Sequence, residues 1–342
     1  MRHTPMLPLL PLVPLYAAGV ALKNSLYDHG LLRPQRLEWP VVSIGNLSVG
    51  GTGKTPFVQE LARLLRQQGW YVSVLSRGHG REGKQAEAVD PDGPASRYGD
   101  EPLMLACGGL DVYVGRKRYE AGRLAEAQHA TLGGKGHSVH LLDDGSQHRK
   151  LARAVDIVLV ERRDLEDWLL PAGHLREPWK ALRRADICVL RQEDRDLAAP
   201  VLAAMGTQHA AQVWLQQRVT TIVATADTSL QRAVAFCGIG NAAQFFASVR
   251  QTGVSVAAEV TFPDHHAYSD GDMRVLVERA ATCRADGFVT TEKDSMRLEG
   301  ELRETLEVTA PLHIARLAVS LAESERCLDA LEALLEKRAG VR

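Results

Sequence analysis

A glycine-rich loop that ends in a lysine and a threonine is the first feature of this sequence that could do chemistry. Residues 46–55 read NLSVGGTGKT, after an apolar run at 40–45 and before apolar residues at helical spacing from Phe57. A strand, a glycine-rich loop, Gly-Lys-Thr and a helix in this order are typical of a P-loop. In such a loop, backbone N–H groups and the helix N-terminus bind phosphate. The predicted nucleotide-binding residues are Ser48, Val49, Gly50, Gly51, Thr52, Gly53, Lys54 and Thr55.

The side chains at the end of this loop have separate predicted tasks. Lys54 would reach the β- and γ-phosphates, and the Thr55 hydroxyl would bind Mg²⁺. The pattern G-x-x-x-x-G-K-[ST] places a glycine where this chain has Ser48. The three glycines that follow compensate for it, and a simple turn before a helix would not explain the Lys-Thr pair.

Two consecutive acids end a second apolar run. Residues 138–142 read SVHLL and are followed by Asp143 and Asp144. An acid at the carboxyl end of a strand lies beside the P-loop in a doubly wound sheet and can hold Mg²⁺. Paired acids at a strand end are equally often turn residues, so this pattern alone leaves both interpretations open.

Alternating strands and helices must position these residues. Apolar runs that indicate strands occur at 71–76, 112–114, 155–161, 186–190, 233–237, 254–262 and 287–291. Helical stretches lie between them, which predicts an α/β fold: a P-loop NTPase-like, mostly parallel sheet with helices on both faces. The polar span 192–218 is a candidate boundary before a second, smaller α/β domain. The predicted parts are an N-terminal membrane-associating segment at 1–36, a P-loop domain at 37–212, the smaller domain at 213–320 and a C-terminal helix at 321–342 that could pack back on the first domain.

The N-terminal segment contains 17 residues without a charge, from Met6 to Leu22. Prolines at every third position favour an extended start, and a helix from about Pro14 would place Leu15 and Leu22 on one face. Three interpretations remain open: a cleaved signal peptide, a helix that packs on the domain, and an apolar helix that lies in the membrane interface.

Charge and cysteine content restrict the partners. The net charge of −1, from 41 Lys+Arg and 42 Asp+Glu, argues against a protein that coats nucleic acid. Residues 1–81, however, hold nine Lys/Arg and only three Asp/Glu, so anionic partners are expected at this end. The five cysteines are at least 44 residues apart, which excludes a Cys-x-x-Cys pair and suggests reduced thiols in the cytosol.

Nine segments in order along the chain resemble the tetraacyldisaccharide 4′-kinase family of lipid A (lipopolysaccharide) biosynthesis. They are VVSIGNLSVGGTGKTP (41–56), SRGHGR (76–81), GDEP (99–102), VGRKRYEAG (114–122), DDGSQHRKLARAVDIVLV (143–160), LLPAGHLREP (169–178), FCGIGNAAQFF (236–246), FPDHHAYS (262–269) and TTEKD (290–294). This chain departs from the family pattern at His79, Ser146 and His174, none of which is a reacting group.

The resemblance implies a reaction and its site residues. The family transfers the γ-phosphate of ATP, with Mg²⁺, to the 4′-hydroxyl of a tetraacylated disaccharide 1-phosphate. Asp100 matches the family's catalytic acid and His265 its partner histidine, with the adjacent His266 as the competing assignment; Lys54 completes the catalytic set. The implied metal-proximal residues are Thr55, Asp143, Asp144 and Glu177. The cations proposed for substrate phosphates are Arg77, Arg81, Arg116, Arg118 and Arg123.

The main competing hypothesis is a membrane-associated P-loop ATPase switch of the ParA/MinD type. Those proteins carry a lysine directly before the paired glycines, where this chain has Val49. The kinase interpretation also implies the partners and the location: the lipid A disaccharide precursor, and a peripheral or monotopic position on the cytoplasmic face of the bacterial inner membrane. No nucleic acid and no obligate protein partner are expected.

Overall fold

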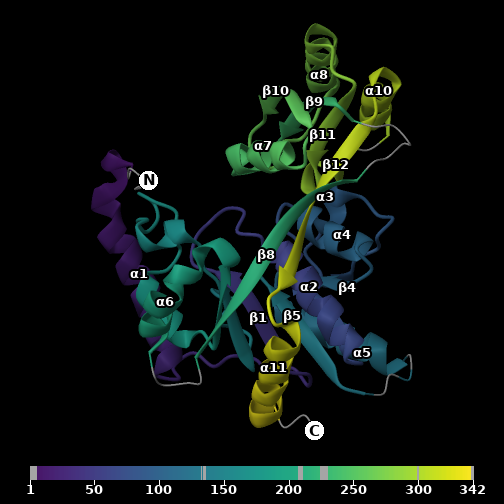
Figure 1. The fold of residues 1–342 in the computed structure, drawn as a ribbon. Helices are drawn as coiled ribbons and strands as arrows, with labels where there is room; N and C mark the ends of the chain where they lie inside the picture. The colour runs from purple at the N-terminus through teal and green to yellow at the C-terminus, as the bar shows by residue number, and fades with distance from the viewer. Residues whose placement is uncertain are drawn as a thin grey trace.

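A single twelve-stranded sheet runs through the chain (Figure 1). The computed structural model describes residues 6–131, 133, 136–206, 211–223, 230–298 and 300–339. The strand order is β10-β9-β11-β12-β8-β7-β6-β1-β5-β2-β4-β3. The strands are β1 (Val41–Asn46), β2 (Tyr71–Ser76), β3 (Glu87–Ala88), β4 (Asp111–Val114), β5 (Ser138–Asp143), β6 (Val155–Leu159), β7 (Ile187–Arg191), β8 (Gln212–Val223), β9 (Arg232–Cys237), β10 (Ser255–Thr261), β11 (Gly287–Thr291) and β12 (Leu312–Leu321).

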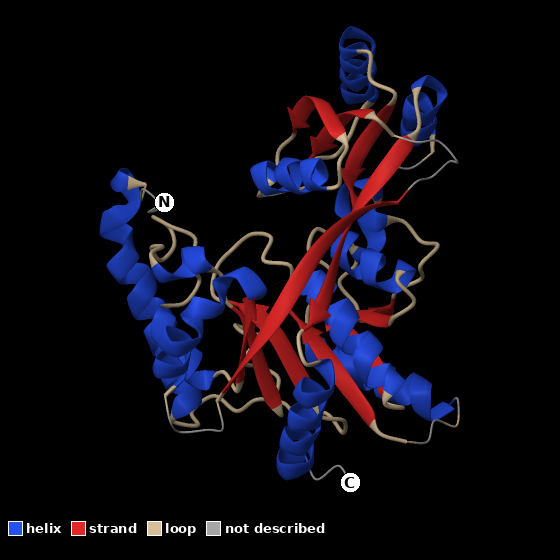
Figure 2. Cartoon of the chain, in the orientation of Figure 1, coloured by secondary structure: helices blue, strands red, loops and turns tan. Residues whose placement is uncertain are grey.

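Helices cover both faces of this sheet (Figure 2). The α-helices are α1 (Val13–Asp28), α2 (Lys54–Gln67), α3 (Ala95–Tyr98), α4 (Asp100–Cys107), α5 (Arg118–Thr131), α6 (Ala198–Met205), α7 (Ala242–Gln251), α8 (Asp270–Cys283), α9 (Glu292–Ser295), α10 (Glu301–Thr309) and α11 (Ser324–Ala339). The 3₁₀ helices are η1 (Leu7–Leu12), η2 (Arg162–Leu165), η3 (Trp179–Arg184) and η4 (Gln192–Leu197).

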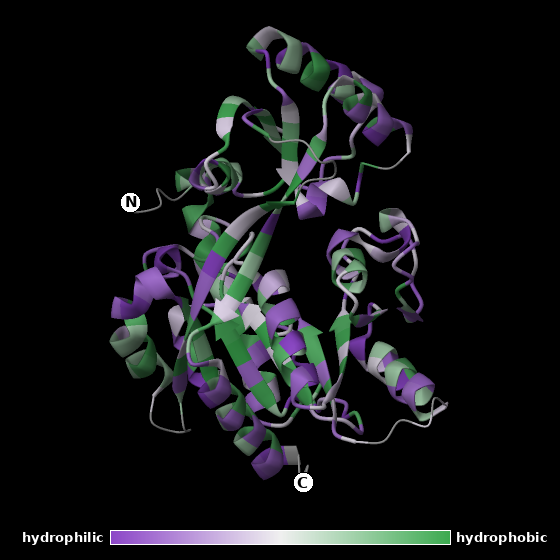
Figure 3. Ribbon diagram, turned by 45° about the vertical axis from the view of Figure 1, so that its right-hand side comes forward, coloured by the Kyte–Doolittle hydropathy of each residue, from purple (hydrophilic) through white to green (hydrophobic). Residues whose placement is uncertain are grey.

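The strands pair in parallel except at β8–β12 and β3–β4, which confirms the predicted mostly parallel α/β fold. All six residues of β1 are buried because both faces of the sheet are covered. The strands around β1 are accordingly hydrophobic (Figure 3). Strand β1 lies between β5 and β6 and pairs Ile44 with Asp143. This pairing places the end of β5 beside the loop that follows β1.

Strands β8 and β12 link the two halves of the sheet (Figure 1). The start of β8 pairs with β7, and the rest pairs antiparallel with β12. The span 192–218, taken as a boundary from the sequence, therefore contains η4, α6 and half of β8. Neither long strand was predicted; β8 is partly exposed on both faces and lacks a clear apolar alternation. The division into domains at 212–213 stays a prediction.

The C-terminal helix packs against the P-loop half of the molecule. Leu328, Leu331 and Leu335 of α11 lie in the same buried cluster as Phe57 and Leu61 of α2. Leu331 and Leu335 are fully buried. This contact joins the C-terminal helix to the core around α2.

The N-terminal helix leaves its apolar side chains exposed. The chain from Leu7 to Asp28 is long and apolar enough to cross a membrane, although a signal sequence would meet the same criterion. Leu15 is 74% and Leu22 63% exposed. The proline-rich start is a 3₁₀ helix rather than the extended segment that we expected. With three residues per turn, this helix accommodates prolines spaced three apart in a single row.

Polar side chains hold α1 on the rest of the protein. Tyr16 Oη donates to Arg176 O at 3.0 Å, and Lys23 Nζ to Gln147 O at 3.0 Å. Asn24 Nδ2 donates to Glu177 Oε1 at 2.9 Å. The helix is thus attached by hydrogen bonds while Leu15 and Leu22 face outward.

Candidate active site

The glycine-rich loop joins the end of β1 to the start of α2. Gly50 and Gly53 have φ angles of 101° and 71°, which residues with a Cβ atom rarely adopt. A Cβ at Gly53 would also lie 3.0 Å from the guanidinium carbon of Arg218. These glycines let the loop curl so that Lys54 and Thr55 begin the helix.

Backbone contacts from distant segments fix the shape of this loop. Val49 N donates to His174 O at 2.8 Å, and Arg176 N to Leu47 O at 2.7 Å. Arg218 of β8 donates to Thr52 O at 2.6 Å. Because the loop is held from both sides, its backbone amides are positioned before any ligand arrives.

Lys54 meets the acid pair at the end of β5. Its Nζ atom lies 3.0 Å from Asn46 Oδ1 and 3.4 Å from Asp144 Oδ1. Asp144 also accepts from Arg176 Nη1 at 2.8 Å. Asp143 accepts from Ser76 Oγ at 3.3 Å. The structure therefore brings together the predicted lysine and both predicted acids.

The two acids have opposite electrostatic environments. Burial, together with the negative charges of Glu101 and Asp144, raises the pKa of Asp143 to about 7. Burial also acts to raise the pKa of Asp144, but the positive charges of Lys54 and Arg176 outweigh it and lower that pKa. Asp143 therefore sits where a further cation would be favourable.

The side chains around the loop and the acid pair are suited to binding a nucleotide phosphate together with a divalent ion. Thr52 Oγ1 is buried without a hydrogen-bond partner, and Thr55 is at the helix N-terminus. No cluster of three or more His, Cys, Asp or Glu side chains suited to a metal occurs among the described residues. Such a set is nevertheless suited to a magnesium ion that keeps several waters and binds mainly to substrate phosphates.

Asp100 and His265 meet although they come from opposite halves of the sheet. His265 Nδ1 lies 3.1 Å from Asp100 Oδ2. Arg297 Nε donates to the same carboxylate oxygen at 2.9 Å, and Lys293 Nζ lies 3.2 Å from His265 Nε2. The neighbouring His266 instead contacts Asp272 at 3.0 Å. The geometry thus pairs Asp100 with the histidine chosen from the sequence.

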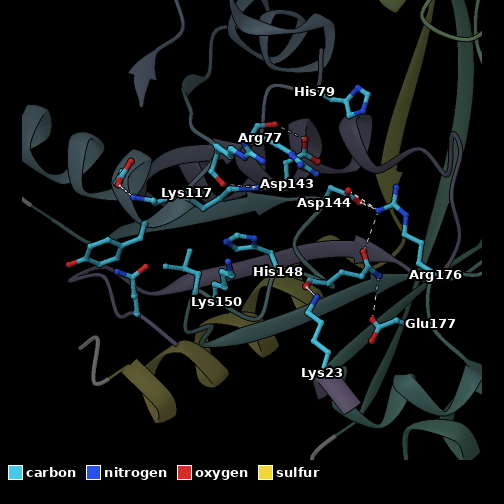
Figure 4. A pocket seen from close by; sticks show the side chains of 18 of the residues that line it. Lys23, Arg77, His79, Lys117, Asp143, Asp144, His148, Lys150, Arg176 and Glu177 are labelled. Carbon is cyan, nitrogen blue, oxygen red and sulfur yellow. Dashed lines mark hydrogen bonds and ion pairs between the residues drawn. The ribbon is translucent and has the colours of Figure 1, made fainter. Parts of the chain in front are cut away.

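A cavity of about 1350 Å³ opens between α1 and the acid pair. Its lining includes Tyr16 and Asn24 of the N-terminal helix and Asp143 and Asp144 of β5 and the following turn. Cations surround it from several elements (Figure 4). These are Lys23, Arg77, Arg116, Lys117, Arg118, Lys150 and Arg176. We call this cavity with its surrounding cations the basin. It is suited to an anionic ligand that enters from the side of the N-terminal helix.

The remaining predicted residues are placed unevenly around this cavity. Arg81 is paired with Glu87 at 2.7 Å, and Arg123 with Glu38 at 2.6 Å; neither lines the cavity. Glu177 does line it, but its carboxylate is bound by Arg184 at 2.7 Å. Of the five predicted arginines, the structure therefore brings only Arg77, Arg116 and Arg118 to the basin.

A second cavity of about 520 Å³ lies between the glycine-rich loop and the β9–β12 half of the sheet. It is lined by loop residues 49–56 and, on the other side, by Ile239, Asn241 and Phe245. His79 and Glu101 line both cavities, so the two spaces adjoin beside His265. A phosphate donor and an anionic acceptor could therefore meet there.

A family model for tetraacyldisaccharide-1-P 4′-kinase matches residues 6–336 of this sequence. The chain belongs to this family. A tetraacyldisaccharide 4′-kinase from Koribacter versatilis is 43% identical over 334 residues, covering 95% of this chain and 98% of the relative. One from Pelobacter propionicus is 37% identical, covering 94% and 91%.

A solved structure supports the same assignment. The LpxK crystal structure from Aquifex aeolicus, in complex with ATP, has a TM-score of 0.73 and 32% identity, and covers 96% of this chain and 98% of that chain. These findings confirm the predicted family and the predicted phosphotransferase class. They do not favour the ParA/MinD alternative.

Several side chains at the site were not anticipated. Lys293 and Arg176 lie within the family segments at 290–294 and 169–178, and this membership could have identified them as site residues. Arg218 and Arg297 lie outside every quoted segment. Only the pairing of β8 and the turn after α9 brings these two arginines to the loop and to Asp100.

Proposed function

We propose that this kinase transfers the γ-phosphate of ATP to the 4′-hydroxyl of a tetraacyldisaccharide 1-phosphate at the cytoplasmic face of the inner membrane. The observation that carries the proposal is the Asp100–His265 contact beside the junction of the two cavities. One cavity holds the glycine-rich loop and the other reaches the N-terminal helix. A donor and a lipid acceptor would therefore enter from different sides.

The smaller cavity is the proposed ATP site. Backbone amides of residues 50–55 would surround the phosphates, since Val49 N already donates to His174 O, and Lys54 would leave Asn46 and Asp144 to contact them. The adenine ring of ATP would lie toward Ile239 and Phe245, where the lining is apolar.

Thr55, Asp143 and Asp144 are the proposed residues for Mg²⁺. The ion would offset the charge that develops on the phosphate oxygens during transfer. Glu177 stays a candidate only through a bridging water, because Arg184 and Asn24 already bind its carboxylate directly.

The larger cavity is the proposed acceptor site. Arg77, Arg116 and Arg118 would bind the acceptor's 1-phosphate, and the exposed face of α1 would lie against its acyl chains. Burial and the neighbouring Arg77 lower the pKa of Arg118 to about 10, so a bound phosphate would relieve repulsion between these cations.

Asp100 is the proposed base. It would accept the proton of the 4′-hydroxyl while the new O–P bond forms and the bond from the γ-phosphorus to the bridging oxygen of ADP breaks. His265 would orient the carboxylate through the contact at 3.1 Å. Because the transition state is loose, holding the reacting groups in line contributes much of the acceleration.

The test is phosphorylation of the lipid by labelled ATP and Mg²⁺, with and without the acceptor. We expect labelled lipid only when the acceptor is present, and a loss of at least about 100-fold in Lys54→Ala, because a charged phosphate contact is removed. ATP hydrolysis at the same rate with and without the acceptor, with no labelled lipid formed, would instead favour the ATPase switch.

A further inference from the structure

Arg297 connects the two halves of the sheet at the reacting carboxylate. It follows α9, and its side chain is only 9% exposed. Its Nε and Nη2 atoms both donate to Asp100 Oδ2, the first at 2.9 Å. An arginine buried at this contact must be held firmly, since a misplaced guanidinium would leave the carboxylate partly unpaired.

Asp294 holds the Arg297 guanidinium on the side away from Asp100. Arg297 Nη1 lies 3.3 Å from Asp294 Oδ1, and Asp294 is fully buried. Gly238 N donates to the same oxygen at 3.1 Å, and Thr291 Oγ1 donates to Oδ2 at 2.6 Å. The guanidinium is therefore fixed between a buried acid and Asp100.

The hydrogen bonds distinguish the two oxygens of Asp100. Lys293 Nζ, a donor, lies 3.2 Å from His265 Nε2. His265 Nδ1 lies 3.1 Å from Asp100 Oδ2 and 3.3 Å from Arg297 Nη2. Arg297 donates to this same oxygen. Within the described residues, Oδ1 receives no hydrogen bond.

The surrounding charges keep this carboxylate ionised. Burial acts to raise the pKa of Asp100, but hydrogen bonds from His265 and Arg297, with the charges of Arg297 and Lys293, lower it to about 2. The other titratable groups near this cluster are Glu101, which pairs with Lys293 at 3.4 Å, and His79, whose ring lies 5.3 Å from that of His265. Asp264 and Asp294 pair with Lys293 and Arg297 respectively, and the buried Tyr268 lies near Asp294 and Arg297.

We propose that Arg297 is a positioning residue for phosphoryl transfer: it holds Asp100 through Oδ2 and leaves Oδ1 as the oxygen that takes the proton of the acceptor. The inference rests on the kinase function proposed above. It differs from a purely structural ion pair, whose loss would lower the stability of the fold without a selective loss of kcat in the folded enzyme.

The experiment compares Arg297→Lys and Arg297→Met with the wild type. Arg303→Met is the matched control, because Arg303 forms an exposed pair with Glu307 in the same half of the molecule. In Arg297→Met we expect kcat to fall about 10- to 100-fold, as for a misplaced reacting group, with KM for ATP within about twofold. Arg297→Lys keeps the charge but not the two donors that converge on Oδ2, so its kcat should be intermediate.

The pH profile separates positioning from fold stability. Loss of the guanidinium should move the acid limb of kcat/KM to higher pH in Arg297→Met, and less in Arg297→Lys. Thermal unfolding of each variant shows whether it folds. If Arg297→Met does not fold, Arg297→Lys decides, and a wild-type kcat and pH profile in that variant overturns the inference.

Two further outcomes are distinguishable. An active wild-type enzyme whose Arg297→Met variant keeps its kcat and acid limb overturns this inference but leaves the kinase function intact. A wild-type enzyme that never labels the acceptor overturns the proposed function, and the role of Arg297 with it.

Discussion

The Asp100 carboxylate and the His265 imidazole lie 3.1 Å apart, although 165 residues separate them in the chain. Asp100 begins α4 in the P-loop half, and His265 follows β10 in the other half. His265 has a φ of 59°, a left-handed conformation that is uncommon outside glycine. Its backbone N–H donates to Gly238 O at 3.2 Å, which holds the residue in that conformation.

Replacing Asp100 with asparagine should remove the base while keeping the shape of the side chain. We expect kcat to fall about 10²- to 10⁴-fold, the usual range for a lost general base, with little change in ATP affinity. Acceptor phosphorylation and equilibrium ATP binding measure the two quantities. Asp329→Asn on the exposed face of α11 is the control, and full activity in Asp100→Asn would contradict the assignment.

Charges on the outer face of α1 should weaken membrane binding. Leu15 and Leu22 are exposed, so Leu15→Glu/Leu22→Glu should fold normally but sediment poorly with vesicles that contain anionic lipid. Val308→Glu is the matched control, because Val308 is 88% exposed on α10. Equal sedimentation of the double variant and the wild type would show that α1 only packs on the protein.

His148 should make the protein less stable in mild acid. Burial and the charges of Arg118, Lys150 and Arg153 lower its pKa from 6.5 to about 4. The unfolded chain therefore binds more protons at this group between these two values, so the free energy of unfolding should decrease as the pH falls from about 6.5 to 4. Urea unfolding at several pH values measures the slope.

The matching variant for this slope is His148→Gln, which cannot titrate. The slope of its free energy of unfolding against pH should be smaller across that window. The decrease in slope corresponds to at most one bound proton. His129→Gln is the control, since its ring lies outside the basin, against Trp39 and Tyr71. An unchanged slope in His148→Gln would place the acid sensitivity elsewhere.

Shortening Leu331 should destabilise the P-loop half. Its side chain is fully buried among α2 and sheet residues, so Leu331→Ala should lower the free energy of unfolding by about 2–5 kcal/mol through lost burial and a cavity. Denaturant unfolding measures this, and Val308→Ala at an exposed position should cost much less. A loss below about 1 kcal/mol would mean that α11 contributes little to this core.

The sequence by itself determined the local chemistry. The order of strand, glycine-rich loop and Lys54-Thr55 predicted a phosphate site because backbone amides at a helix start need no distant partner to face an anion. The apolar runs likewise predicted most strands, since a strand buried on both faces must be apolar throughout. The family motifs added Asp100 and His265, which no local pattern marks as reactive.

Only the tertiary structure decided how these pieces meet. Strands β8 and β12 carry the sheet from one half to the other, and the partly exposed β8, which lacks a clear apolar alternation, brings Arg218 to the loop. Arg81 and Arg123 have the same side chain as Arg118, yet they pair with Glu87 and Glu38 outside the basin while Arg118 enters it. Residue type sets what a group can bind, but the position of its partners in space sets what it does bind, and for Arg297 and Asp100 those partners are 197 residues apart.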